Sequence, residues 1–156
     1  MALRKILTSE QPELRKAARP VVKFDERLHE LLDDMYETLK QAHGAGLAAT
    51  QVGILRRVVV IDVGEGVIEL VNPEIIEVSG EQEVNEGCLS VPGMRGKTKR
   101  PAKVKIKALD RNGKQFEMEG EDLLAVAFCH ETDHLDGKLY TDIVEGELWE
   151  EGSECE

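Results

Sequence analysis

The feature that most constrains this chain is the pattern His-Glu-x-x-His at residues 130–134, which follows a run of six apolar residues. Because side chains at i and i+4 lie on one face of an α-helix, the imidazoles of His130 and His134 can approach one metal ion. Glu131 points about 100° away around the helix, where it can serve a water molecule on that metal. We therefore expect a metal-binding helix over 121–135. The alternative is a pair of solvated histidines on an amphipathic helix.

Length and charge exclude several classes of protein. The 156 residues suit a single domain with one core, so residues 1–156 are expected to form one catalytic domain. Lys and Arg number 20 against 31 Asp and Glu, a net charge of −11, which argues against DNA binding. No apolar run approaches the roughly 20 residues of a membrane span, and the N-terminus shows no signal peptide. Three cysteines at unrelated spacings predict no disulfide framework. These features predict a cytoplasmic protein with no membrane partner.

The rest of the chain predicts an α+β fold. A helix is expected over 25–42, where Asp25 is a good N-cap and leucines recur at helical spacing. A shorter helix is expected to begin near Pro12. Strands are expected at 57–62, 67–71, 74–79, 82–86, 103–109 and 115–119. Short antiparallel strands with separate helices favour antiparallel β-sheets packed around a central metal-binding helix that carries the His-Glu-x-x-His pattern. The acidic tail at 145–156 is expected to fray.

A catalytic site of the zinc type needs a third protein ligand. A metallopeptidase with the pattern H-E-x-x-H-x-x-G-x-x-H would have a third histidine where this chain has Tyr140. Thiolates suit zinc and iron(II), so the cysteines are better candidates. Cys129 points away from the histidine pair and is expected in the core, and Cys155 lies in the acidic tail. Cys88 remains, either as a ligand or as a small buried hydrophobe, and its spacing does not choose between them.

The glycine-rich segment 44–51 superficially matches the G-x-G-x-x-G/A fingerprint of dinucleotide sites. That fingerprint must follow a strand and open a helix, whereas this segment follows an expected helix and precedes an expected strand. A dinucleotide site is therefore not predicted. A tight turn between two elements, or the close approach of an extended ligand backbone, explains the glycines instead.

Three segments together resemble the peptide deformylases, which remove the formyl group from new bacterial polypeptides. The family motifs G-φ-G-φ-A-A-x-Q, E-G-C-φ-S and H-E-x-D-H stand at 44–51, 86–90 and 130–134, in that order and without mismatch. The resemblance runs from about residue 3 to residue 143. It implies one divalent metal ion per chain, Fe(II) in the cell and Zn, Ni or Co in some preparations. The metal ligands that it implies are Cys88, His130 and His134.

The resemblance also implies a mechanism and a substrate, the N-formyl-methionyl peptide. A metal-bound water attacks the formyl carbon with Glu131 as general base and then acid, while the Gln51 amide and the Leu89 N–H stabilise the oxyanion. The residues expected to contact substrate are Ala45, Gly46, Gly87, Val126 and Cys129. An ion pair of Glu86 with Arg100 is expected to hold the Cys88 loop, and Asp133 to orient a neighbouring group.

The chain departs from the family in two places. Cys129 stands where many relatives have Gln, and the C-terminus is short and acidic where relatives continue into a basic helix that docks on the ribosome. Ribosome association is therefore expected to be weakened by repulsion from RNA.

Two alternative functions stay open: a metallopeptidase that cuts internal bonds, and a binding module that holds a structural metal with Cys129 as fourth ligand.

Overall fold

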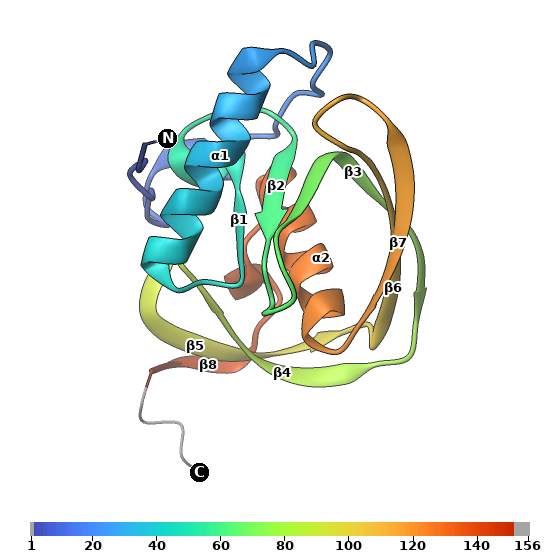
Figure 1. The fold of residues 1–156 in the computed structure, drawn as a ribbon. Coiled ribbons are helices and arrows are strands. Elements are labelled where there is room, and N and C mark those ends of the chain that lie inside the picture. The colour runs from blue at the N-terminus through green and yellow to red at the C-terminus, as the bar shows by residue number, and fades with distance from the viewer. Residues whose placement is uncertain (1, 152–156) are drawn as a thin grey trace.

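The computed structural model describes residues 2–151 as two antiparallel sheets and two α-helices (Figure 1). The five-stranded sheet has the order β1-β2-β3-β6-β7, and the three-stranded sheet has the order β4-β5-β8. The helices and strands are η1 (Pro12–Arg15), α1 (Glu26–Ala42), β1 (Gly46–Ala48), η2 (Ala49–Val52), β2 (Val58–Ile61), β3 (Ile68–Ser79), β4 (Gln82–Cys88), β5 (Val91–Arg100), β6 (Lys103–Leu109), β7 (Gln115–Glu121), α2 (Leu123–Leu135), η3 (Tyr140–Asp142) and β8 (Glu145–Glu150). The expected α+β class is confirmed.

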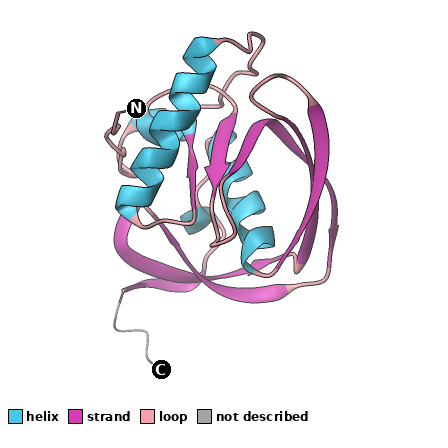
Figure 2. Cartoon of the chain, in the orientation of Figure 1, coloured by secondary structure: helices cyan, strands magenta, loops and turns pink. Residues whose placement is uncertain are grey.

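Helix α2, which carries the His-Glu-x-x-His pattern, lies inside the fold. It packs against strands of the five-stranded sheet and also contacts β5 of the other sheet (Figure 2). Strand β2 is buried along its whole length because helices cover both of its faces. Val58 and Val60 pack in the cluster with α1, whereas Val59 and Ile61 pack in the cluster with α2. This two-sided burial explains why the β2 sequence is continuously apolar.

Helix α1 follows the sequence prediction closely. A side-chain oxygen of Asp25 accepts a hydrogen bond from the Leu28 backbone N–H at 3.2 Å and so caps the first turn. The leucines that recur at helical spacing are buried against the sheet. The helix ends at Ala42, as expected, and its C-cap residue His43 adopts the left-handed conformation with φ of 57°.

Strand β3 corrects the prediction of two strands separated by Asn72 and Pro73. The structure has one strand that continues through this dipeptide, with its register shifted between Val71 and Glu74. Asn72 has a positive φ of 51°, and its amide group exchanges two hydrogen bonds with the backbone of Val21, at 2.8 and 3.0 Å. The irregularity interrupts the ladder where proline cannot donate, so the strand accommodates Pro73.

The three-stranded sheet differs most from expectation. Strand β5 was not predicted, and β8 forms over residues 145–150, where the tail was expected to fray. Strand β8 pairs with β5, with Arg95 opposite Trp149. The remainder of that tail, 152–156, lies outside the described residues. Within residues 2–151, no helix has both the length and the apolar character that a membrane span requires.

Candidate metal centre

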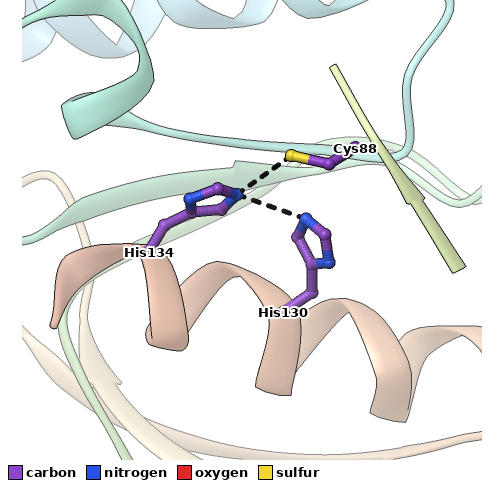
Figure 3. Close-up of side chains that lie close together, drawn as sticks. All are labelled: Cys88, His130 and His134. Atoms are coloured by element: carbon purple, nitrogen blue, oxygen red, sulfur yellow. Dashed lines mark hydrogen bonds between the residues drawn. The ribbon is translucent and has the colours of Figure 1, made fainter. Parts of the chain in front are cut away.

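Three potential metal ligands converge where the end of β4 meets α2 (Figure 3). His134 Nε2 lies 3.2 Å from Cys88 Sγ and 3.2 Å from His130 Nε2. The edges of a tetrahedral zinc site measure roughly 3.3–3.6 Å for such ligands, given the usual metal–nitrogen and metal–sulfur bond lengths. One thiolate and two imidazoles form a donor set that suits zinc or iron(II). These three residues therefore fit a divalent metal ion.

Burial controls the charge of the groups around these ligands. Burial lowers the pKa of His134, which keeps this imidazole neutral as a metal ligand requires. Burial also raises the pKa of Glu131 to about 7. Among the described residues, Glu131 Oε1 is buried and has no hydrogen-bond partner. A buried carboxylate oxygen without a partner is costly, so it indicates a functional position.

Gly46 explains how β1 comes so close to Glu131. A Cβ atom at position 46 would lie 2.6 Å from Glu131 Oε2 and 3.0 Å from its Cδ. The family resemblance predicts a substrate contact at this glycine, but its nearest neighbour in the structure is the Glu131 carboxylate. Any side chain at position 46 would displace Glu131 from its place beside the ligands.

Gln51 lies 37 residues before Cys88 in the sequence but beside it in space. Its Nε2 donates a hydrogen bond to Ser90 Oγ at 3.1 Å and lies 3.6 Å from Cys88 Sγ. Its Oε1 accepts from the Ala48 backbone N–H at 2.9 Å, which fixes the orientation of the amide. The side chain is buried, with 1% of its surface exposed. The structure thus brings Gln51 to the candidate metal centre, and Ser90, the last residue of the motif at 86–90, contributes to its placement.

A buried charge network supports the ligand helix from behind. The Glu86 carboxylate accepts from Arg100 Nε at 2.9 Å, from Arg100 Nη2 at 2.6 Å and from Thr98 Oγ1 at 2.6 Å, and it also contacts His130 Nδ1. Arg100 Nη1 donates to Asp133 Oδ2 at 2.9 Å. Burial alone would raise the pKa of Glu86, but hydrogen bonds from His130 and Arg100 outweigh burial and lower the pKa to about 2. The expected ion pair is present, and it reaches a ligand imidazole as well as the Cys88 strand.

A cavity of about 600 Å³ opens beside the ligands. Residues expected to contact substrate that line it are Ala45, Gly46, Gly87 and Val126, and Leu89 lines it as well. Leu123, Val126 and Ala127 lie at i, i+3 and i+4 on α2 and give the cavity an apolar wall. Leu123 and Ala127 were missed, although the helical spacing back from His130 was the signal for them.

The structure places Cys129 in the core, as helix geometry predicts, and not at the cavity wall, where the family resemblance places it. Cys129 is not among the residues that line the cavity, and it packs in the core cluster with 7% of its surface exposed. Its position next to His130 in the sequence turns it about 100° away around the helix. Burial raises the pKa of its thiol to about 11, which disfavours the thiolate that a fourth metal ligand would need.

Proteins of similar sequence identify the family of this chain. A family model described as polypeptide deformylase matches residues 3–148. The chain is 60% identical over 142 residues to a peptide deformylase of Alkaliphilus metalliredigens, a match that covers 91% of this chain and 97% of that protein. The chain belongs to the peptide deformylase family. It is therefore an enzyme of this metal-dependent class, whose activity is the removal of N-formyl groups from nascent polypeptides.

Solved structures of peptide deformylases have the same fold. The crystal structure of the Legionella pneumophila peptide deformylase matches with a TM-score of 0.90 at 50% identity, over 92% of this chain and 87% of that one. The Thermotoga maritima peptide deformylase matches with a TM-score of 0.91 at 40% identity, over 94% of this chain and all of that one. The resemblance drawn from three short motifs is thereby confirmed along nearly the whole described chain.

Proposed function

We propose that this chain hydrolyses the formamide bond of N-formyl-methionyl nascent polypeptides and releases formate, with a divalent metal ion held by Cys88, His130 and His134. The observation that carries the proposal is the convergence of these three ligands beside buried Glu131 at the wall of a 600 Å³ cavity. We expect Fe(II) in the cell, and Zn, Ni or Co in some preparations. When bound, the metal ion would act as a Lewis acid and lower the pKa of water.

Glu131 is the proton carrier in this proposal. Glu131 directly follows the proposed ligand His130 in the sequence, and its Oε1 has no hydrogen-bond partner among the described residues. A carboxylate with a pKa near 7 accepts and returns a proton with little cost at neutral pH. Glu131 therefore takes a proton from the attacking water and later gives it to the departing amine nitrogen.

Two donors are assigned to the oxyanion that develops on the formyl oxygen. Gln51 Nε2 already lies 3.6 Å from Cys88 Sγ, and Leu89 follows Cys88 directly and lines the cavity. A side-chain amide and a backbone N–H that are fixed before reaction stabilise developing charge without reorganisation. The buried charge network of Glu86, Arg100 and Asp133 orients His130 and α2 rather than touching substrate.

The cavity walls suit a methionyl peptide. We assign the methionine side chain to the apolar wall of Leu123, Val126 and Ala127. The peptide main chain would lie as an added strand beside Ala45, Gly46 and Gly87, which makes recognition independent of most side chains. A cytoplasmic location follows from the substrate. Ribosome docking through β8 is disfavoured because its glutamates would be repelled by RNA.

Formate release from a formyl-methionyl tripeptide tests the proposal, with anaerobically purified wild type beside Glu131→Gln. We expect turnover by the wild type and a loss of at least ~10²-fold in the variant, because the proton carrier is removed. The variant should retain its metal ion, since none of the ligands is changed. Glu119→Gln, a carboxylate on β7 that does not line the 600 Å³ cavity, serves as the matched control.

Two results would contradict the proposal. Absence of formate from protein with one bound metal ion per chain would overturn the reaction. Cleavage of internal peptide bonds instead would favour a metallopeptidase, and full activity of Glu131→Gln would remove Glu131 from its assigned role.

A further inference from the structure

The C-terminal strand brings a carboxylate to the wall of the cavity. Strand β8 pairs with β5, and beyond its end the Glu151 backbone N–H donates a hydrogen bond to the Gly93 carbonyl at 2.8 Å. Glu151 consequently lines the cavity together with Arg95 of β5. Arg95 Nε lies 3.6 Å from Glu151 Oε2, so the two side chains form an ion pair. The tail that was expected to fray thus contributes a charge to the cavity wall.

Arg95 is held in place on the side of the cavity where the peptide main chain is proposed to lie. Its Nη1 donates a hydrogen bond to the Asn85 carbonyl at 2.9 Å. A Cβ atom at Gly87 would lie 3.4 Å from Arg95 Cζ and 3.5 Å from its Nε, which is ordinary contact distance. The guanidinium therefore lies directly against Gly87. A peptide that runs along Gly87 passes beside this charge.

Arg95 and Glu151 are more exposed to solvent than the other charged residues that line the cavity. Glu86 and Glu131 line the cavity but are buried, at 3% and 4% exposed. The side chains of Arg95 and Glu151 are 37% and 54% exposed. Among the described lining residues, they are the only Arg, Lys, Asp or Glu side chains that face solvent. Among the charged side chains that line the cavity, these two exposed groups therefore lie nearest to a charged substrate side chain at the cavity opening.

We propose that Arg95 and Glu151 form a charge pair that sets the preference of the enzyme for charged side chains downstream of the formyl-methionine. This inference rests on the proposed deformylase function. While paired, the two opposite charges largely cancel, so acidic and basic peptides are treated more evenly. Removing one partner leaves the other uncompensated beside the substrate path. The pair determines specificity and takes no part in bond cleavage.

The test compares kcat/KM for two amidated peptides, formyl-Met-Ala-Asp and formyl-Met-Ala-Lys, as an acidic-to-basic ratio. Amidation removes the terminal carboxylate, so the third side chain supplies the difference in charge. Relative to wild type, Glu151→Gln should raise the ratio about three- to tenfold, and Arg95→Gln should lower it by a similar factor. The shifts should arise mainly in KM and shrink at about 0.5 M NaCl, because exposed charges are screened.

Glu145→Gln is the matched control. It removes an ion pair with Lys99, at 3.8 Å, that joins the same two strands without lining the cavity. Its ratio should equal that of wild type. A ratio that changes less than about twofold in both cavity variants, or that shifts equally in the control, would overturn the inference. Absence of formate from wild type with either peptide, and with neutral formyl-Met-Ala-Ser, would overturn the proposed function and this inference with it.

Discussion

Two sets of ion pairs hold strands together in this molecule, and their surroundings differ sharply. The buried charge network joins β4, β5 and α2, and its central pair, Glu86 with Arg100, is 3% and 5% exposed. The second set is a lysine ladder on the solvent face of β6. Its pairs are Lys103 with Glu121 at 3.3 Å, Lys105 with Glu117 at 3.4 Å, and Lys107 with Glu74 at 3.8 Å.

The comparison shows that the environment, rather than the number of ion pairs, decides what a charge contributes. Water and salt screen the ladder, so each exposed pair contributes about 0–1 kcal/mol. Removing one partner of a buried pair leaves a desolvated charge and costs about 3–5 kcal/mol. The network also contacts His130 through Glu86. It therefore couples the stability of the fold to the orientation of a proposed ligand, whereas the ladder affects only the surface of the sheet.

The largest effect should come from Arg100→Met. It keeps much of the side-chain volume but leaves Glu86 and Asp133 without their cation, so we expect a loss of about 3–5 kcal/mol in the free energy of unfolding. Urea denaturation of the metal-free protein measures it. In a Glu86→Gln background, the same substitution should lower the free energy of unfolding clearly less, because no buried Glu86 charge is then left without a partner. Equal costs in both backgrounds would show that the two residues do not act as a pair.

A smaller loss is expected from Thr98→Val. The hydroxyl donates to Glu86 Oε1 at 2.6 Å, and Thr98 is fully buried. A buried hydrogen bond to a charged group contributes about 1.5–3 kcal/mol, which the same denaturation should detect. Thr8→Val removes a hydroxyl that bonds exposed Glu10 over the same 2.6 Å, and it should change stability much less. Similar losses from the two variants would show that burial does not decide what these hydrogen bonds contribute to stability.

The smallest effect is expected from Lys105→Gln in the ladder. Lys105 and Glu117 are 35% and 46% exposed, so the loss should stay below about 1 kcal/mol in low salt. It should fall further when urea denaturation is repeated at about 1 M NaCl. The matched comparison is Arg100→Met, whose cost should be nearly independent of salt. A cost for Lys105→Gln as large as that of Arg100→Met would show that exposed and buried ion pairs contribute equally to stability.

Strands β6 and β5 show which parts of the fold the sequence could predict. Strand β6 alternates lysines with apolar residues, so its bounds and its wet and dry faces were both evident from local pattern. Strand β5 holds Pro92, Gly93 and Gly96 among polar residues, and this composition is typical of a loop. Gly96 makes the strand possible because Val144 and Leu148 pack where its side chain would be. That contact is long-range, so no local pattern reports it.

The candidate site also has residues that a local pattern predicts and residues that it does not. His130, Glu131 and His134 were evident because one helical turn brings the two imidazoles together. Cys88 lies in a distant segment, and only the resemblance to a family assigned it. Helix geometry predicts Cys129 in the core, and the structure places it there, whereas the family resemblance assigned it to the cavity wall. The helix face that leads to the candidate ligands carries Ala127 instead.

Metal dependence of formate release is the most direct test that Cys88, His130 and His134 hold a catalytic metal ion. The purified protein would be assayed with a formyl-methionyl tripeptide as isolated, after exhaustive chelation under anaerobic conditions, and after addition of Fe(II) or Zn(II). We expect chelation to abolish formate release while the chain stays folded, and one equivalent of metal per chain to restore it. Cys88→Ser should weaken that restoration, because a hydroxyl is a poorer ligand than a thiolate. Undiminished formate release by folded protein that contains no metal would show that the metal ion is not needed for catalysis.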